Sequence, residues 1–107
     1  MTPICKTNDI VPNSGVCALV DGHQVAVFRT DDDRFYAIDN FDPFSKANVL
    51  SRGLLGGQGD KLYVASPLHK QRFYLDTGEC LDDETVSVRS YRVLTEDNRV
   101  YISAADH

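Results

Sequence analysis

Short runs of hydrophobic and β-branched residues, each ending in a turn sequence, dominate this chain. Val16–Val20 and His23–Arg29 flank Asp21-Gly22, a dipeptide that tolerates the positive φ angles of a two-residue hairpin loop. The acidic turn Thr30–Asp33 leads to another such run, Arg34–Ile38. Turns spaced about ten residues apart are typical of a β meander. The pattern therefore predicts three antiparallel strands in this part of the chain.

The second half of the chain continues the pattern. Further strands, rich in aromatic and β-branched residues, are predicted at Lys61–Ala65, Arg72–Leu75, Val86–Val93 and Arg99–Ile102. The helical signal is limited to single turns at Asn8–Val11 and at Phe44–Ser51, which follows Asp42-Pro43. The glycine-rich stretch Gly56–Gly59 is predicted to be a loop, since no helical pattern follows it. Neither helical turn is long enough to cover a sheet, so the predicted fold is all-β, a small antiparallel sandwich or barrel.

Length and charge narrow the range of functions. The chain has 107 residues, which suffices for one domain, 1–107, with a modest core. Its net charge of −5 argues against nucleic acid or an anionic membrane as the main partner, because both select clustered Lys and Arg. The longest apolar run, Val16–Val20, is too short to span a bilayer, and Met1–Asp9 lacks the pattern of a secretory signal. We therefore expect a cytoplasmic protein.

The cysteines and the acidic runs show no pattern of a metal site. The chain has three cysteines, Cys5, Cys17 and Cys80. This is an odd number, and none of them is in C-x-x-C spacing. Cys5 and Cys17 stand in apolar runs, so both are predicted to be small buried hydrophobes. The runs Asp31–Asp33 and Asp82–Glu84 fall between strands and are expected to be solvated turns, because they lack the ligand spacing of a calcium loop.

Motifs of catalysis are absent from the sequence, and a single histidine has a suggestive context. The patterns G-x-S-x-G, H-E-x-x-H, the P-loop and G-x-G-x-x-G do not occur. His23 follows a hairpin turn and His107 ends the sequence, so both are expected to be exposed and inert. His69 lies near Ser66, but no carboxylate is specified that would orient a Ser–His pair. We therefore expect no catalytic residue on this chain.

Two segments around His69, Ala37–Phe44 and Val64–Phe73, resemble the two cluster-binding loops of Rieske iron–sulfur domains. In that family each loop supplies one Cys and one His, as C-P-H in the first loop and C-P-x-H-G in the second, and a T-G turn follows downstream. The supporting positions fit this pattern and are Asn40, Pro43, Ser51–Gly53, Pro67, Phe73 and Thr77–Gly78. The resemblance implies a Rieske-like fold with both loops at one tip.

Three of the four ligand positions implied by the resemblance carry other residues. Asp42, Phe44 and Ser66 replace the first Cys, the first His and the second Cys, and His69 alone is retained. Lys70 also replaces the usual Gly. A Rieske centre needs two thiolates on one iron and two imidazoles on the other, so we expect no cluster here. A mononuclear site at Asp42 and His69 would lack a third protein ligand, so no other metal is expected either.

One group of Rieske-like proteins also lacks the cluster ligands, namely the small subunits of cytoplasmic NAD(P)H-dependent nitrite reductases. This chain resembles them along nearly its whole length. The likeness is carried by Gly15–Leu19, Asp42–Phe44, Val49–Gly53, Val64–Leu68, Lys70–Phe73 and Asp76–Cys80. It implies a non-catalytic accessory subunit of an enzyme that reduces nitrite to ammonia. It also implies that the large subunit is the partner and holds FAD, sirohaem and the iron–sulfur cluster. The alternatives are a stand-alone Rieske-type ferredoxin, against which the missing ligands count, and an independent enzyme.

The tip formed by the two loops is a candidate docking surface. Its apolar and charged residues would be Phe44, Leu68, Lys46, Arg52, Lys70 and Arg72. An apolar anchor with Arg nearby is typical of an interface hot spot, so the tip is expected to contact the large subunit. In the alternative interpretation, Phe44 and Leu68 fold inward and fill the volume of the missing cluster. Both interpretations need the same residues, and the sequence leaves both open.

Overall fold

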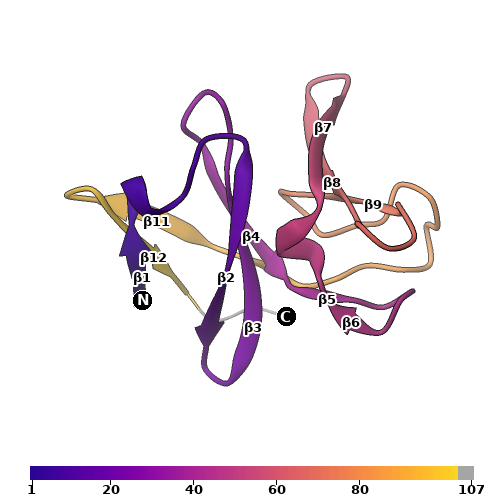
Figure 1. The fold of residues 1–107 in the computed structure, drawn as a ribbon, viewed down its shortest axis with the longest axis horizontal. Coiled ribbons are helices and arrows are strands. Elements are labelled where there is room, and N and C mark those ends of the chain that lie inside the picture. Colours follow the sequence, from indigo (N-terminus) through magenta and orange to yellow (C-terminus); the bar gives the residue numbers. More distant parts are fainter. Residues whose placement is uncertain (104–107) are drawn as a thin grey trace.

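The computed structural model describes residues 1–103 and consists largely of antiparallel strands (Figure 1). The strands are β1 Thr2–Lys6, β2 Ser14–Val20, β3 His23–Arg29, β4 Phe35–Asp39, β5 Phe41–Asp42, β6 Ala47–Asn48, β7 Leu54–Gln58, β8 Lys61–Ala65, β9 Arg72–Tyr74, β10 Ser90–Tyr91, β11 Val93–Glu96 and β12 Arg99–Ile102. Two 3-10 helices, η1 Thr7–Asp9 and η2 Leu50–Arg52, complete the described elements. Residues 104–107 of the predicted domain, which include His107, lie outside the described residues.

The strands form four sheets with the orders β1-β12-β11, β10-β4-β3-β2, β5-β6 and β7-β8-β9. In Figure 1 the sheet of β1, β11 and β12 lies on the left, the sheet of β7, β8 and β9 lies on the right, and β2 to β4 stand between them. All strand pairs are antiparallel, which confirms the predicted all-β fold. No helix among residues 1–103 has the length and apolar character needed to cross a membrane.

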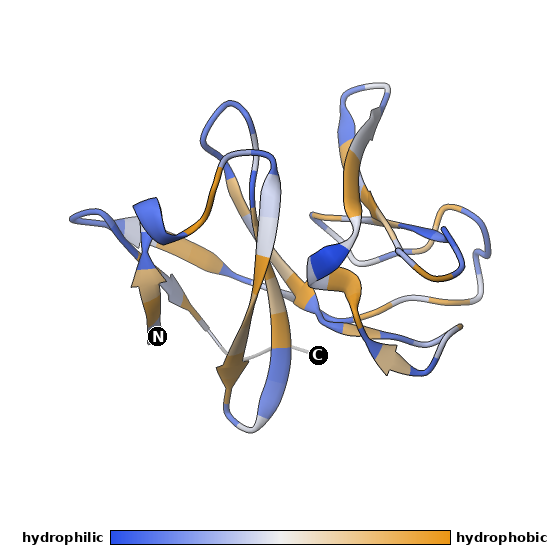
Figure 2. Cartoon of the chain, in the orientation of Figure 1, coloured by the Kyte–Doolittle hydropathy of each residue, from blue (hydrophilic) through white to orange (hydrophobic). Residues whose placement is uncertain are grey.

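β3 separates two hydrophobic clusters. Its residues Val25 and Val27 belong to the first cluster, whereas Ala26 and Phe28 belong to the second. Alternate side chains of a strand point to opposite faces of a sheet, and all four are completely buried. The hydrophobic segments of β3 and β4 accordingly cross the middle of the molecule (Figure 2). The second cluster includes residues that flank the predicted loops, namely Leu50, Val64 and Phe73.

The predicted central hairpin is confirmed. β2 and β3 pair from Ser14 opposite Arg29 to Val20 opposite His23. The two loop residues Asp21 and Gly22 have φ angles of 49° and 81°, as a tight two-residue turn requires. The strands predicted at Arg34–Ile38, Lys61–Ala65, Arg72–Leu75 and Arg99–Ile102 are also present, with their ends shifted by one residue at most. A single turn of 3-10 helix, η1, falls where the first helical turn is predicted.

Three local predictions were wrong. Phe44–Ser51 does not form a helical turn but completes the β5–β6 hairpin and then enters η2. Gly56–Gly59 is not a loop as a whole, because β7 pairs with β8 through Gln58 and only Gly59 lies in the turn between them. Val86–Val93 is not one continuous strand, since only its last part enters β10 and β11 and Ser87 makes an isolated bridge with Glu79.

The predicted burial of the cysteines was also wrong for one of them. Cys17 is exposed, Cys5 is half-buried and Cys80 is buried. Cys17 lies on β2 between Val16 and Ala18, which pack against the first cluster, so its own side chain points to the opposite face. Its sulfur contacts polar side chains and accepts a hydrogen bond from the Asn40 side chain at 3.4 Å.

Candidate functional site

The two predicted loops lie side by side and are joined by a buried hydrogen bond. Asp42 ends β5 and Ser66 follows β8. The Ser66 hydroxyl donates to Asp42 Oδ2 at 2.5 Å, and the two residues are only 0% and 1% exposed. The backbone N–H of Phe44 donates to the other carboxylate oxygen, Oδ1, at 2.9 Å. The positions that match the two Rieske cysteines therefore contact each other directly.

The hydrogen bonds around Asp42 keep this buried carboxyl group ionised. Burial alone would raise its pKa, because a low-dielectric environment disfavours the charged form. The hydrogen bonds from the Ser66 hydroxyl and the Phe44 N–H favour the carboxylate and outweigh burial, so the pKa of Asp42 lies below its usual value. Hydrogen bonds to an ionised acceptor are stronger than those between neutral groups. The pair therefore ties the two loops together at neutral pH.

Both loops form the same turn. In each, a proline follows the residue at the Cys position, and a lysine four residues beyond that position has a positive φ angle. The N–H of Lys46 donates to the carbonyl of Asp42 at 2.7 Å, and the N–H of Lys70 donates to the carbonyl of Ser66 at 3.0 Å. The φ angle of Lys70 is 63°, in the left-handed region that favours glycine, and Lys70 stands at the Gly position of the family motif.

Phe44 and Leu68 have different environments in the structure, a difference that the sequence did not reveal. Phe44 is half-buried and packs against Phe73 of the second cluster, with ring centroids 6.1 Å apart. Leu68, in contrast, is 55% exposed, and its neighbour His69 is also exposed. Phe44 therefore extends the core beneath the loops, while Leu68 and His69 form the outer surface of the tip.

The side chains at the four ligand positions do not fit a Rieske cluster. Asp42 and Ser66 supply oxygen atoms that already bond to each other, Phe44 supplies no ligand atom, and His69 supplies one imidazole. A Rieske centre requires two thiolates and two imidazoles. Throughout residues 1–103, no three His, Cys, Asp or Glu side chains converge in the way that metal ligands would.

The cations predicted at the tip fall into two groups. Lys46, Arg52 and Lys70 are exposed, and their side chains form no ion pair within the described part of the chain. Arg72 instead lies on β9, where its guanidinium is 2.8 Å from the carboxylate of Asp82. These three exposed cations occur in a chain whose net charge is −5.

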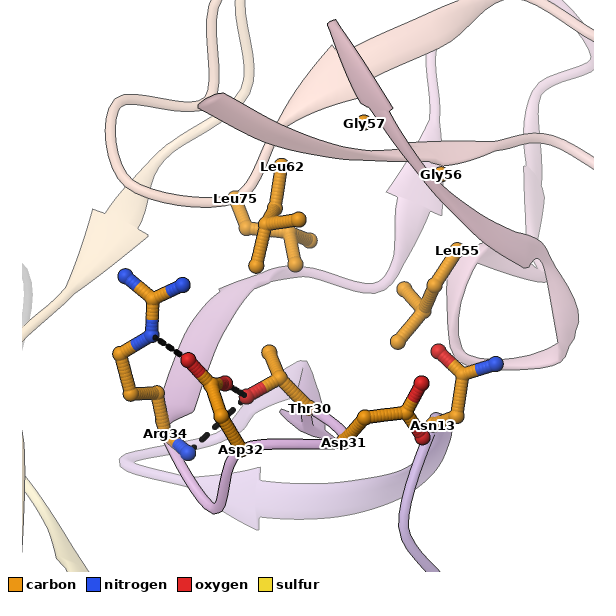
Figure 3. A pocket seen from close by; sticks show the side chains of 10 residues that line it. All are labelled: Asn13, Thr30, Asp31, Asp32, Arg34, Leu55, Gly56, Gly57, Leu62 and Leu75. Carbon is orange, nitrogen blue, oxygen red and sulfur yellow. Dashed lines mark hydrogen bonds and ion pairs between the residues drawn. The ribbon is translucent and has the colours of Figure 1, made fainter. Parts of the chain in front are cut away.

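A second surface feature is a cleft of about 420 Å³ between the β7–β8 hairpin and the turn after β3 (Figure 3). Apolar side chains of Leu55, Leu62 and Leu75 line it from one side, and the turn after β3 lines it from the other. The sequence did not predict this cleft, because the glycines of β7 predicted a loop; the aspartates after β3 do form the exposed turn that was predicted.

Comparison with known proteins agrees with the resemblance. The family model of the Rieske-like [2Fe-2S] domain matches residues 1–103. The small subunit of nitrite reductase (NADH) from Salmonella typhimurium is 51% identical over 100 residues, which cover 92% of this chain and 93% of that protein. The solution NMR structure of the nitrite reductase NAD(P)H small subunit from Erwinia carotovora has a TM-score of 0.82 and 50% identity, and the match covers 99% of this chain and 82% of that chain.

The same domain also matches part of a much longer protein. The nitrite reductase NAD(P)H large subunit from Klebsiella oxytoca is 42% identical over 99 residues, which cover 92% of this chain and 10% of that protein. The altered ligand positions of the tip and the near full-length likeness to the shorter relatives lead to one conclusion. The chain belongs to the Rieske-like [2Fe-2S] domain family and, within it, to the small subunits of NADH-dependent nitrite reductase.

Proposed function

We propose that the chain is a single-domain, non-catalytic accessory subunit of a cytoplasmic NAD(P)H-dependent nitrite reductase, which reduces nitrite to ammonia. The large subunit is its partner and holds FAD, sirohaem and the iron–sulfur cluster. Two findings support this proposal. The chain is similar along nearly its whole length to small subunits of nitrite reductase, and a matching segment lies within the Klebsiella large subunit. A domain that occurs both as a separate chain and within the large subunit is expected to act in contact with it.

The observation that carries the non-catalytic role is the buried pair of Asp42 and Ser66. A cluster at this position would hold the two loops together through its ligands. In this chain the 2.5 Å hydrogen bond joins the loops, and Phe44 packs beneath them against Phe73. The tip is therefore a preformed surface without a redox centre, and its role is to bind rather than to carry electrons.

The tip surface is the proposed docking site on the large subunit. Leu68 is its exposed apolar residue, and Lys46, Arg52 and Lys70 are the unpaired cations near it. Apolar anchors surrounded by polar or charged residues are typical of the centre and rim of an interface. Phe44 supports this surface from below, and Arg72, paired with Asp82, contributes at its margin.

Binding to a separately purified large subunit tests this function. The wild-type chain is expected to form a stable complex, and Leu68→Asp is expected to weaken the affinity at least about tenfold, because a charge replaces a central apolar contact. Leu94→Asp is the matched control, since Leu94 is 45% exposed on β11 and does not belong to the tip. Failure of the wild-type chain to bind would overturn the proposed function. Equal binding by the Leu68→Asp and Leu94→Asp variants would overturn the tip as the docking site.

The alternative function, a stand-alone Rieske-type ferredoxin, requires a cluster on this chain. The side chains of Asp42, Phe44 and Ser66 argue against it, because none of them supplies a thiolate or an imidazole. The visible absorption spectrum of the chain, purified anaerobically under reducing conditions and then oxidised, distinguishes the two functions. A featureless visible spectrum supports the accessory subunit, and the bands of a Rieske centre would support the ferredoxin.

A further inference from the structure

The outer edge of β7 is open to solvent. β7 lies at the end of the sheet order β7-β8-β9 and pairs only with β8. Within residues 1–103 its backbone makes no other hydrogen bond. An edge strand presents unpaired N–H and C=O groups that can accept another extended chain. Figure 1 shows the β7–β8 hairpin projecting from the rest of the molecule.

The free backbone groups of this edge belong to Leu55 and Gly57. The N–H of Leu75 donates to the carbonyl of Leu62 at 3.0 Å, so the backbone groups of Leu62 face away from β7. Gly57 is the residue opposite Leu62, and therefore its own N–H and C=O point away from β8. The same alternation applies to Leu55, two residues earlier. Both residues also line the cleft of about 420 Å³, so the open edge and the cleft adjoin each other.

β7 carries none of the features that usually protect an edge strand. Its sequence, Leu-Leu-Gly-Gly-Gln, has no charge and no proline, and Leu54 at its start is 79% exposed. Two other edge strands carry such features: β1 contains Pro3 and Lys6, and β11 contains Glu96. β2, which is also uncharged, faces β1 of the same chain across a smaller cleft. The β7 edge is thus more available to a partner than the edges of β1, β2 and β11.

The two glycines of β7, Gly56 and Gly57, differ in whether a side chain would fit at their position. A Cβ atom on Gly56 would lie 2.6 Å from the ring of Tyr63, so the packing of this chain requires glycine there. A Cβ atom on Gly57 would meet its nearest neighbour, Leu62, only at 3.7 Å, an ordinary contact. The packing of the chain does not require Gly57. The missing side chain instead leaves room on the cleft side of β7, and glycine in a strand often marks the close approach of another group.

The cleft has an apolar wall and a free negative charge. Leu55, Leu62 and Leu75 form the wall. Across the cleft, the Asp32 carboxylate is bonded to Thr30 and Arg34, whereas the Asp31 carboxylate has no partner in the described part of the chain (Figure 3). Lys and Arg combine an apolar stem with a charged end, so either side chain matches this combination.

We propose that the β7 edge binds an extended, basic segment of the nitrite reductase large subunit, which adds a strand to the β7-β8-β9 sheet. The backbone of that segment pairs with Leu55 and Gly57, and a Lys or Arg of the segment enters the cleft toward Asp31. The proposal rests on the proposed function for the identity of the partner. A second copy of this chain is a poorer occupant, because it also carries a net charge of −5 and would bring its own Asp31 to the same edge.

This site differs in charge from the tip. The tip presents Lys46, Arg52 and Lys70, while the β7 cleft presents Asp31. Two contacts of opposite charge would admit a single orientation of the subunit on its partner, since the reversed orientation would bring like charges together.

Affinity for the large subunit, measured with four variants, tests the proposal. Gly57→Pro removes the outward N–H without breaking a bond to β8, and Gly57→Val keeps the N–H but fills the cleft. Both are expected to weaken binding at least about tenfold while the circular dichroism spectrum and melting temperature show a folded chain. Asp31→Lys is expected to weaken binding to a similar extent, whereas the control Glu96→Lys on the β11 edge leaves it within about twofold.

Hydrogen exchange in the wild-type complex provides a second readout. The amides of Leu55 and Gly57 are expected to gain protection when the large subunit binds, while that of Gly59 in the hairpin turn does not. If the wild-type chain binds but the variants of Gly57 and Asp31 bind equally well, the β7 site is wrong and the proposed function stands. If the wild-type chain does not bind at all, the proposed function itself fails. If the chain self-associates and Gly57→Pro abolishes this, the occupant is a second copy and the proposal is overturned.

Discussion

Ser66 Oγ lies 2.5 Å from Asp42 Oδ2, and neither side chain is accessible to solvent. The two residues are 24 positions apart in the sequence, so their bond ties the loop after β5 to the loop after β8. They occupy the positions of the two cysteines in the Rieske pattern. In a Rieske domain the cysteines at these two positions ligate one iron atom. Here the same positions are linked by a hydrogen bond from the neutral Ser66 hydroxyl to the ionised Asp42 carboxylate. The stability of the tip is expected to depend on this bond.

Replacing Ser66 by Ala should lower the free energy of unfolding by about 1.5–3 kcal/mol, because it leaves a buried carboxylate without one of its donors. Urea unfolding followed by circular dichroism measures this change. Thr85→Ala is the control: the Thr85 hydroxyl also donates to a carboxylate, that of Asp83, but this pair is exposed. The control should change stability by no more than about 0.5 kcal/mol. Equal losses of unfolding free energy in both variants would show that the buried hydrogen bond contributes no more to stability than the exposed one.

Acid should weaken the contribution of Asp42 to stability. Its pKa is lowered in the folded chain from the usual 3.8, so the carboxylate stabilises the fold above that pH. This contribution is lost as the pH falls through the lowered pKa, when the folded chain also becomes protonated at Asp42. The difference in unfolding free energy between wild type and Asp42→Asn is therefore expected to be constant near neutral pH and to shrink below about pH 4. Other carboxylates cancel in this difference. A difference that grows on acidification would contradict the direction of the pKa shift.

Phe44→Ala should destabilise the chain by about 2 kcal/mol. The ring packs against Phe73 but is only half-buried, so the loss should be smaller than the 3–5 kcal/mol that is roughly typical of a fully buried Phe. Phe41→Ala is the matched control, because Phe41 is 43% exposed on the preceding strand, and it should lose less. Thermal and urea unfolding measure both variants. An unchanged stability of Phe44→Ala would mean that its ring does not serve as part of the core.

Restoring the ligands should restore a cluster. The variant Asp42→Cys, Phe44→His, Ser66→Cys and Lys70→Gly, together with the native His69, carries the complete Rieske set. The loops already lie side by side with matching turns, so reconstitution with iron and sulfide is expected to give a Rieske spectrum and about two irons per chain. The same variant with His69→Ala is the control and should not form that centre. A folded but colourless complete variant would show that the loop geometry does not correspond to a cluster site.

The strands that could be predicted from the sequence are those in which local chemistry and tertiary packing agree. Asp21-Gly22 dictates a tight hairpin through its positive φ angles, and the β-branched residues of β3 favour a strand that is buried on both faces. β7 could not be predicted, because two glycines have low strand propensity. Its pairing with β8 is supported by the ring of Tyr63, which lies over Gly56. That contact is known only from the folded chain.

The candidate site was predictable in its positions but not in its contacts. The spacing of Asp42, Pro43, Ser66 and Pro67 identified the two loops. The hydrogen bond between Asp42 and Ser66 joins segments that are remote in sequence, and no local pattern specifies it. The helical turn predicted after Pro43 was wrong because Lys46 adopts a φ angle of 56° and reverses the chain into the β5–β6 hairpin.

We propose that the Rieske-like tip of this chain works without a metal centre, and the iron content of the purified chain is the decisive measurement. The chain should be purified anaerobically from cells supplied with iron, and its iron should be measured per polypeptide. We expect substoichiometric iron in a folded chain that still binds the large subunit. About two irons per chain, accompanied by the spectrum of a Rieske centre, would contradict it.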